Sequence, residues 1–283
     1  MKNKTINIIK ASGETTLFSP EKLRQSLHRA GENEEVVNEI VTKVQENLYD
    51  GMTTKKIYQL AFGLLKKQSH YSAAKYKLKQ AIMEFGPSGF PFEIFVAAII
   101  NYQGYAVKVG EIVKGHCVNH EIDVIAEKEN QHFMIECKFH NQPGINCDVK
   151  IPLYIQARFK DVEEEWKNIP GHTNKFHQGW VVTNTKFTGD AIQYSLCAGL
   201  NLLGWDYPNG NGLREQIDAS GLYPLTCLTT LTLHEKRLLL DKRKVLCKEL
   251  CNNPELLSEI HIPAERRNSI MNEANVLCKG IHA

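Results

Sequence analysis

Asp123, Glu136 and Lys138 are the residues whose types and spacing could carry out hydrolytic chemistry. They lie in the stretch HEIDVIAEKENQHFMIECKFH, residues 120–140, which is otherwise rich in apolar residues. Two carboxylates and one ammonium are costly to desolvate unless a cation binds among them. Mg²⁺ prefers hard oxygen ligands, and when bound it can hold a phosphodiester and activate a water molecule. This group of residues therefore predicts a magnesium-dependent site that hydrolyses phosphodiesters.

The same stretch predicts a β-hairpin that would bring the three residues together. Apolar and polar residues alternate over 122–126, and residues 127–130 form a polar turn before a second apolar strand. Residues two apart on a strand face the same side, so Glu136 and Lys138 project together. Pairing of the two strands brings Asp123 beside them. The alternative is a solvated hairpin with an ordinary Glu–Lys pair, and the apolar run FMIECK argues against it.

An Asp, a gap of twelve residues and then Glu-x-Lys resembles the signature of the PD-(D/E)xK nuclease superfamily. The flanking residues IECKFH resemble its Mrr-like, type IV restriction branch. The resemblance implies that Asp123 and Glu136 bind Mg²⁺, helped by the carbonyl of Cys137. It also implies that Lys138 stabilises the phosphate in the transition state and helps to deprotonate or orient water. The substrate would be DNA, and double-strand cleavage would need two active sites and hence a homodimer.

Two helices around the hairpin supply further candidates. The first, residues 92–102, has Glu93 as its one charged residue; Mrr-like relatives often carry an acidic residue here that approaches the metal. The alternative is a first-turn Glu that the helix dipole favours. In the second helix, residues 152–167, Gln156 best matches an Mrr-like glutamine that could orient the attacking water. Arg158 either contacts backbone phosphate or forms a salt bridge with the EEE run of its own helix.

The order of elements in this region predicts the fold class. Beyond the hairpin and its flanking helices, strands are expected at residues 105–109, 179–183 and 200–205, and a helix at 191–198. A mixed sheet between helices follows from this order. We therefore expect an α/β, restriction-endonuclease-like fold in the middle of the chain.

The N-terminal residues predict a compact, mostly helical module. Residues 5–18 alternate around a Gly-bearing turn and predict a hairpin. Ser19 and Pro20 then mark a helix start, as N-cap and first helical residue. Apolar stripes predict three more helices, with Thr53 or Thr54 capping the third and a fourth running over residues 74–82.

This module resembles the ATP cone, a regulatory nucleotide-binding domain best known from ribonucleotide reductases. The matching text is IIKASG, Phe18, EKLRQSLHRAG and AAKYKLKQAI, within residues 4–84. The resemblance implies that ATP or dATP binds, with Lys10, Lys22 and Lys75 contacting its phosphates. Ala11 and Thr16 replace a basic and an acidic residue common in the family. The alternative is a basic helical module that binds no nucleotide.

Two Gly- and Pro-rich stretches, GPSGFP at 86–91 and YPNGNG at 207–212, divide the chain. They predict an ATP cone at 1–85, a nuclease domain at 90–222 and a small helical domain at 224–283. The last is weakly similar to helix-hairpin-helix tails, which bind DNA backbone or partners. Its basic residues either serve such a role or form a solvated face: Lys236, Arg237, Lys242, Arg243 and Lys244.

Length and composition fit a multidomain globular chain. The chain has 283 residues, of which 42% are hydrophobic, so two or three domains are expected. Residues 1–83 hold 14 Lys and Arg against 8 Asp and Glu, so the N-terminal end suits an anionic partner. No run reaches the length of a membrane span and MKNKTINIIK lacks the apolar centre of a signal peptide, so we expect a cytoplasmic protein without a membrane partner.

Cysteine and histidine patterns are less informative. The eight cysteines contain no CxxC, so neither a zinc ribbon nor a disulfide framework is predicted, and Cys247 and Cys251 lie at the spacing of a helical core pair. Four histidines surround the hairpin. They either hold zinc or are solvated strand-end residues: His116, His120, His132 and His140.

Taken together, these patterns predict a magnesium-dependent DNA endonuclease of restriction, defence or repair type with a nucleotide-responsive N-terminal domain. The alternative is a nucleotide-sensing DNA-binding protein with a degenerate, inactive nuclease core. Intact Asp123, Glu136 and Lys138 favour the enzyme. A ribonucleotide-reductase-type regulator that does not bind DNA is disfavoured by the nuclease-like middle of the chain.

Overall fold

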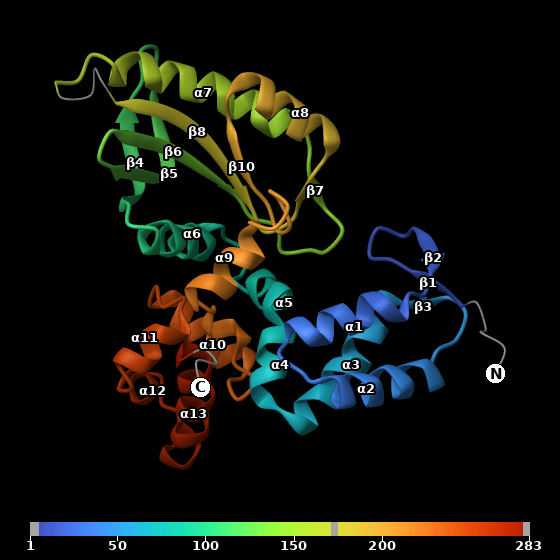
Figure 1. Ribbon diagram of the computed structural model, residues 1–283. Helices are drawn as coiled ribbons and strands as arrows, with labels where there is room; N and C mark the ends of the chain where they lie inside the picture. Colours follow the sequence, from blue (N-terminus) through green and yellow to red (C-terminus); the bar gives the residue numbers. More distant parts are fainter. Residues whose placement is uncertain (1–5, 171–174, 280–283) are drawn as a thin grey trace. The chain divides into compact units, whose positions relative to one another are not determined.

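The computed structural model describes residues 6–170 and 175–279 (Figure 1). The chain forms two compact units, each assembled from separate stretches. Unit 1 comprises 1–84, 224–238 and 247–283, and unit 2 comprises 85–223 and 239–246. The predicted boundaries at 1–85, 90–222 and 224–283 stay a proposal. In the described part of the chain, no helix has both the length and the apolar character needed to span a bilayer.

A small sheet opens unit 1. The predicted hairpin is confirmed as β1 (Asn7–Ile9) and β2 (Thr15–Leu17), which pair antiparallel. Gly13 lies in its turn with φ of 85°, a left-handed conformation that glycine adopts without strain. The sheet also contains β3 (Met52–Thr53), parallel to β1, which was not predicted because two residues carry no strand periodicity.

Five helices follow these strands. The predicted start of the first helix is confirmed: Ser19 accepts a hydrogen bond from the Lys22 N–H and Pro20 is the first helical residue. Thr53 caps the third helix. The helix predicted over 74–82 is confirmed on both sides of Lys77, where a one-residue turn with φ of −76° and ψ of −9° divides it into two helices. The helices are α1 (Pro20–Arg29), α2 (Glu34–Glu46), α3 (Thr54–Gln68), α4 (His70–Tyr76) and α5 (Leu78–Met83).

The C-terminal helices complete unit 1. A 3₁₀ turn, η1 (Leu225–Cys227), packs on α5, and the Thr226 hydroxyl donates to the carbonyl of Ala81 at 2.7 Å. The last helix also contacts α4. Cys247 is buried as predicted, and Cys251 Sγ lies 2.9 Å from Cys278 Sγ. The helices are α10 (Leu233–Asp241), whose last three residues belong to unit 2, α11 (Cys247–Asn252), α12 (Leu256–Glu259) and α13 (Ala264–Lys279).

One member of the predicted basic face of this tail lies inside unit 1. Lys236 is only 3% exposed, and its ammonium donates to the carbonyl of Thr226 at 2.7 Å. The prediction that it belongs to a solvated or DNA-binding face is therefore wrong. Arg237 and Lys242 are exposed, as expected for such a face. A basic run at helical spacing does not reveal which of its members turns inward.

Unit 2 is built on the predicted mixed sheet. Its strand order is β10-β8-β6-β5-β4; β4, β5 and β6 pair antiparallel, and β6, β8 and β10 are parallel. Helices α7 (Lys150–Trp166) and α8 (Gly189–Ala198) cover one face and α6 (Phe90–Tyr102) covers the other (Figure 1). The strands are β4 (Ala106–Lys114), β5 (Asn119–Lys128), β6 (Gln131–Lys138), β8 (Phe176–Thr183) and β10 (Asn201–Leu203).

The predicted order of helices and strands in unit 2 is confirmed. The helices are α6 (Phe90–Tyr102), α7 (Lys150–Trp166), α8 (Gly189–Ala198) and α9 (Leu213–Ser220). One core lies between α7 and the sheet, where Ile155 and Phe159 pack with Met134 and Val181. A short parallel pair, β7 (Asn146–Cys147) and β9 (Lys186–Phe187), was not predicted. Burial on both sides explains why β6 and β8 read as continuous apolar runs.

Candidate active site

The residues predicted to act together lie at one end of the β5–β6 hairpin. The ladder between these strands ends at the pair Val124–Ile135, so Asp123 and Glu136 lie directly beyond the last pair. The Cys137 N–H donates to Asp123 Oδ2 at 2.7 Å, which fixes this carboxylate against β6. Oδ1 has no hydrogen-bond partner among the described residues, so it is available to a ligand.

Glu136 is the most buried carboxylate of the site, at 5% exposed. Lys138 Nζ lies 2.6 Å from its Oε1, and Arg158 Nη1 lies 2.6 Å from its Oε2. Arg158 also donates to the carbonyl of Glu121. The predicted salt bridge between Arg158 and the EEE run of its own helix is therefore wrong, because α7 turns the guanidinium towards the strand ends. Two cations balance the buried charge of Glu136.

The other two acidic residues have raised pKa values. Burial, and then the nearby Glu136 carboxylate, raises the pKa of Asp123 to about 6. Burial, and then Asp123, raises the pKa of Glu93 to about 7. Because the charges of Asp123, Glu121 and Glu136 all act on Glu93, α6 contributes to the same site. A cation bound here would favour the ionised form of both acids.

The donor set fits a hard divalent cation. Asp123 offers a free carboxylate oxygen, and Glu136 offers two oxygens that pair with Lys138 and Arg158. Among the described residues no group of three or more His, Cys, Asp or Glu side chains is placed to hold a metal ion. Mg²⁺ matches this arrangement, because it is commonly held by one or two carboxylates while keeping several water ligands.

Two residues at the end of β8, Thr183 and Asn184, fix the position of the backbone at and after Lys138, the last residue of β6. Neither was predicted from the sequence. The Thr183 hydroxyl donates to the carbonyl of Lys138 at 2.7 Å. Asn184 accepts from the His140 N–H at 2.9 Å and donates to the His140 carbonyl at 2.7 Å. Both side chains are almost fully buried. The signal was the polar TNT run directly after an apolar strand.

Asp161 of α7 holds the turn between β4 and β5, and it too was missed. It accepts from the N–H groups of Cys117 at 2.7 Å and Val118 at 3.3 Å, and it lies 2.7 Å from the ring of His120. The hydrogen bond with His120, with help from the backbone donors, lowers the pKa of Asp161. A Cβ on Gly115 would come within 2.2 Å of its carboxylate, so this close approach requires glycine.

A second candidate site lies in unit 1 under the N-terminal hairpin. A cavity of ≈ 220 Å³ is lined by Lys10 and Lys22, and also by Tyr58 and Tyr76. The structure therefore brings together two of the three lysines predicted to contact nucleotide phosphates. Lys75 is not among the lining residues; its ammonium lies 5.6 Å from the ring centre of Tyr71.

An unpartnered hydroxyl marks this cavity as a place for a polar ligand. The Tyr58 hydroxyl is buried and has no hydrogen-bond partner among the described residues. Burial raises its pKa well above the usual value, so it stays a donor. Its ring stacks on Tyr76, with ring centres 5.2 Å apart. An aromatic wall beside two ammonium groups suits a base and its phosphates.

Comparison with known proteins finds family models for three stretches of the chain. The family model for the ATP cone domain matches residues 6–79, the restriction endonuclease model matches 87–204, and the model "AF1548-like, C-terminal" matches 223–278. An uncharacterized protein of Archaeoglobus fulgidus is 36% identical over 183 residues, which cover 63% of this chain and 97% of the relative. The chain belongs to the AF1548-like family.

A solved structure supports the same family. The crystal structure of protein of unknown function AF1548 matches with 35% identity and a TM-score of 0.56, covering 68% of this chain and all of the other. The predicted fusion of an ATP cone with an Mrr-like endonuclease domain is thereby confirmed. This AF1548-like protein therefore carries a nuclease domain of the PD-(D/E)xK superfamily.

Gln156, His120 and His132 have partners outside the central group. The Gln156 amide donates to the carbonyl of Ala198 at 3.3 Å, so its part in orienting water stays a prediction. His132 is buried, with its ring 3.9 Å from that of Trp166. The expectation of a solvated strand-end histidine is therefore wrong at that position. His120 pairs with Asp161 instead of facing solvent.

Proposed function

We propose that this AF1548-like protein is a Mg²⁺-dependent endonuclease that hydrolyses DNA phosphodiester bonds under the control of a nucleotide bound to its ATP cone. The observation that carries the proposal is the convergence of Asp123, Glu136 and Lys138 at one strand end, with Lys138 Nζ 2.6 Å from the buried carboxylate. In that geometry, the carboxylates of Asp123 and Glu136 that would bind a cation lie beside the ammonium of Lys138.

The protein's own groups would divide the work of hydrolysis. Bound Mg²⁺ would supply positive charge against the phosphate and lower the pKa of a water molecule. Asp123 and Glu136 would hold the ion, helped by the carbonyl of Cys137. Lys138, held through its backbone by Thr183, would stabilise the negative charge that develops on the phosphate.

Glu93 suits the transfer of a proton. Its pKa of about 7 lies near neutrality, where a carboxylate can both accept and release a proton. Gln156 and Glu93 are second-rank candidates, the first for orienting water and the second also for metal binding. Double-strand cleavage would require two copies of the chain, each supplying one site.

The ATP cone would make the activity depend on nucleotide. ATP or dATP would place its phosphates against Lys10 and Lys22 and would offer an acceptor to the Tyr58 hydroxyl. Lys75 would reach it only from outside the cavity lining.

One experiment tests the activity. The full chain is incubated with methylated, unmethylated and branched DNA, in Mg²⁺ or EDTA, with and without ATP. We expect cleavage in Mg²⁺ alone, with a rate that changes when ATP is added. Asp123→Asn should abolish cleavage, and Glu111→Gln, which changes an exposed residue of β4, should not. DNA binding without cleavage under every condition would instead identify an inactive sensor.

A further inference from the structure

A second basic cavity lies in unit 1, away from the residues that line the nucleotide cavity. It measures ≈ 310 Å³ and lies between α3 with the α4–α5 region on one side and residues 229–236 on the other. Three lysines line it: Lys66, Lys77 and Lys236. It shares no lining residue with the cavity of Lys10 and Lys22.

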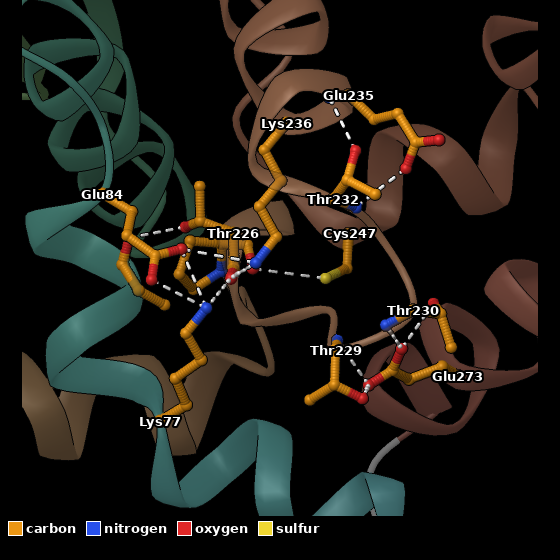
Figure 2. A network of polar contacts seen from close by, with 12 residues as sticks. Lys77, Glu84, Thr226, Thr229, Thr230, Thr232, Glu235, Lys236, Cys247 and Glu273 are labelled. Carbon is orange, nitrogen blue, oxygen red and sulfur yellow. Dashed lines mark hydrogen bonds and ion pairs between the residues drawn. The ribbon is translucent and has the colours of Figure 1, made fainter. Parts of the chain in front are cut away.

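Lys77 and Lys236 converge on one carboxylate and one carbonyl (Figure 2). Lys77 Nζ lies 2.8 Å from the Glu84 carboxylate, and Lys236 Nζ lies 3.3 Å from it. Both ammonium groups also donate to the carbonyl of Thr226, at 3.3 Å and 2.7 Å. Lys66 makes one long bond of 3.4 Å, to the carbonyl of Thr229. The cavity lining therefore holds three ammonium groups and one carboxylate, and that carboxylate pairs with two of them.

The other acidic residues nearby are already engaged (Figure 2). The Glu273 carboxylate accepts four hydrogen bonds from Thr229 and Thr230, from their N–H groups at 2.8 and 2.9 Å and their hydroxyls at 2.8 and 2.6 Å. Glu235 is paired with Arg266 at 2.5 Å. Neither carboxylate is placed to balance the lysines.

The surplus of positive charge acts on the pKa of Lys236. Burial, and then the neighbouring Lys77, lowers the pKa of Lys236 to about 8. A buried ammonium without enough negative charge is held in place at the expense of folding stability. An anion entering the cavity would offset that cost.

We propose that this cavity binds a phosphate-class anion, either inorganic phosphate or the phosphate of a phosphomonoester. Ammonium groups bind phosphate as point charges, and the dianion would balance the charge that Glu84 leaves over. Phe62, Leu231 and Leu233 form the apolar part of the lining. That part leaves room for a non-polar portion of a phosphomonoester.

The bound anion would join two parts of unit 1 that are distant in sequence. Lys66 belongs to α3, whereas Lys236 lies in α10, after the whole of residues 85–223. Simultaneous contact with both would stabilise the attachment of the C-terminal segment to the ATP cone.

The test measures anion binding by the full chain, independently of cleavage. Inorganic phosphate, AMP and chloride are compared at equal ionic strength by calorimetry and by thermal unfolding. The decisive pair is Lys66→Gln and Lys67→Gln, because Lys67 is the exposed neighbour on α3 and does not line the cavity. We expect phosphate to bind about tenfold more weakly to Lys66→Gln than to wild type, and with wild-type affinity to Lys67→Gln.

A further variant and the comparison with AMP separate the alternatives. Glu84→Gln should tighten phosphate binding, because it removes the competing carboxylate, and a merely structural ion pair would show no such gain. Binding of AMP that also depends on Lys66 would assign a phosphomonoester, and binding of phosphate alone would assign the free ion. The absence of binding beyond that in chloride, or equal losses in Lys66→Gln and Lys67→Gln, would overturn the proposal.

Discussion

Arg158 and Glu136 form an ion pair of 2.6 Å between helix α7 and strand β6, with side chains 13% and 6% exposed. The carboxylate expected to bind the metal is therefore held by a guanidinium on one oxygen and by Lys138 on the other. In this arrangement two cations hold the orientation of the buried carboxylate. The pair makes Arg158 a positioning residue.

Arg158→Met should destabilise unit 2. Removing one partner leaves Glu136 with Lys138 alone, which should lower the free energy of unfolding by about 2 kcal/mol. The three Trp residues of the chain all lie between residues 85 and 223, so Trp fluorescence in urea reports on this unit. Lys160→Met is the matched control on α7, since the Lys160–Glu163 pair is exposed at the lysine and should be worth less than about 1 kcal/mol. Equal losses in both variants would contradict a special role for Arg158.

The raised pKa of Asp123 predicts how stability depends on pH. Well below pH 4 the carboxyl is protonated in both the folded and the unfolded protein. As pH rises towards its folded pKa of about 6, the unfolded chain ionises first, so wild type should lose stability relative to Asp123→Asn. We expect a loss of up to about 2 kcal/mol between pH 4 and pH 7 in EDTA.

Mg²⁺ should remove that loss in wild type, because the ion favours the charged carboxylate. Thermal unfolding followed by Trp fluorescence, at several pH values in EDTA and in Mg²⁺, measures both effects. A pH profile of Asp123→Asn that parallels wild type would show that the acid ionises freely.

Lys138→Ala should separate DNA binding from catalysis. One phosphate contact among several changes the slope of affinity against salt by only about 0.9. Loss of a fixed donor to the transition state should instead reduce cleavage about 10²–10³-fold. Binding titrations at two salt concentrations, beside single-turnover cleavage, measure the two quantities. If both fall by the same factor, Lys138 only docks the DNA.

Lys22→Gln should weaken nucleotide binding by the ATP cone. The ammonium lines the cavity below the hairpin, and its loss should raise the Kd for ATP or dATP about tenfold. Calorimetry on the full chain measures this, with Lys55→Gln as an exposed control on α3. Lys75→Gln should have a smaller effect, because Lys75 does not line the cavity. If Lys22→Gln bound ATP and dATP with the wild-type Kd, Lys22 would not contact the nucleotide phosphates.

What could be predicted from the sequence was local. Ser19 and Pro20 predicted a helix start because Ser favours the N-cap and Pro the first helical position. The alternation between residues 122 and 126 predicted the strand that carries Asp123. The proximity of Asp123, Glu136 and Lys138 could be predicted because strand periodicity and hairpin pairing are themselves local rules. The ATP cone and the nuclease domain followed from their resemblance to known families.

What could not be predicted depends on contacts across the fold. Arg158 meets Glu136 only because α7 packs on β6, and the competing EEE run of its own helix lay nearer in sequence. Lys236 meets Glu84 across 152 residues, so no helical period could show that it turns inward. The role of Asn184 was not predicted because it bonds to the backbone of His140, and backbone groups are the same whatever the residue type.

The chain crosses between its two units four times, since residues 85–223 and 239–246 belong to unit 2 and the remainder to unit 1. During synthesis, the whole five-stranded sheet leaves the ribosome before α11 and α13 exist. A core that is complete early can fold early. Unit 1, although it begins the chain, is then completed last, so a ribosome that stops before residue 247 would release the five-stranded sheet together with an incomplete unit 1.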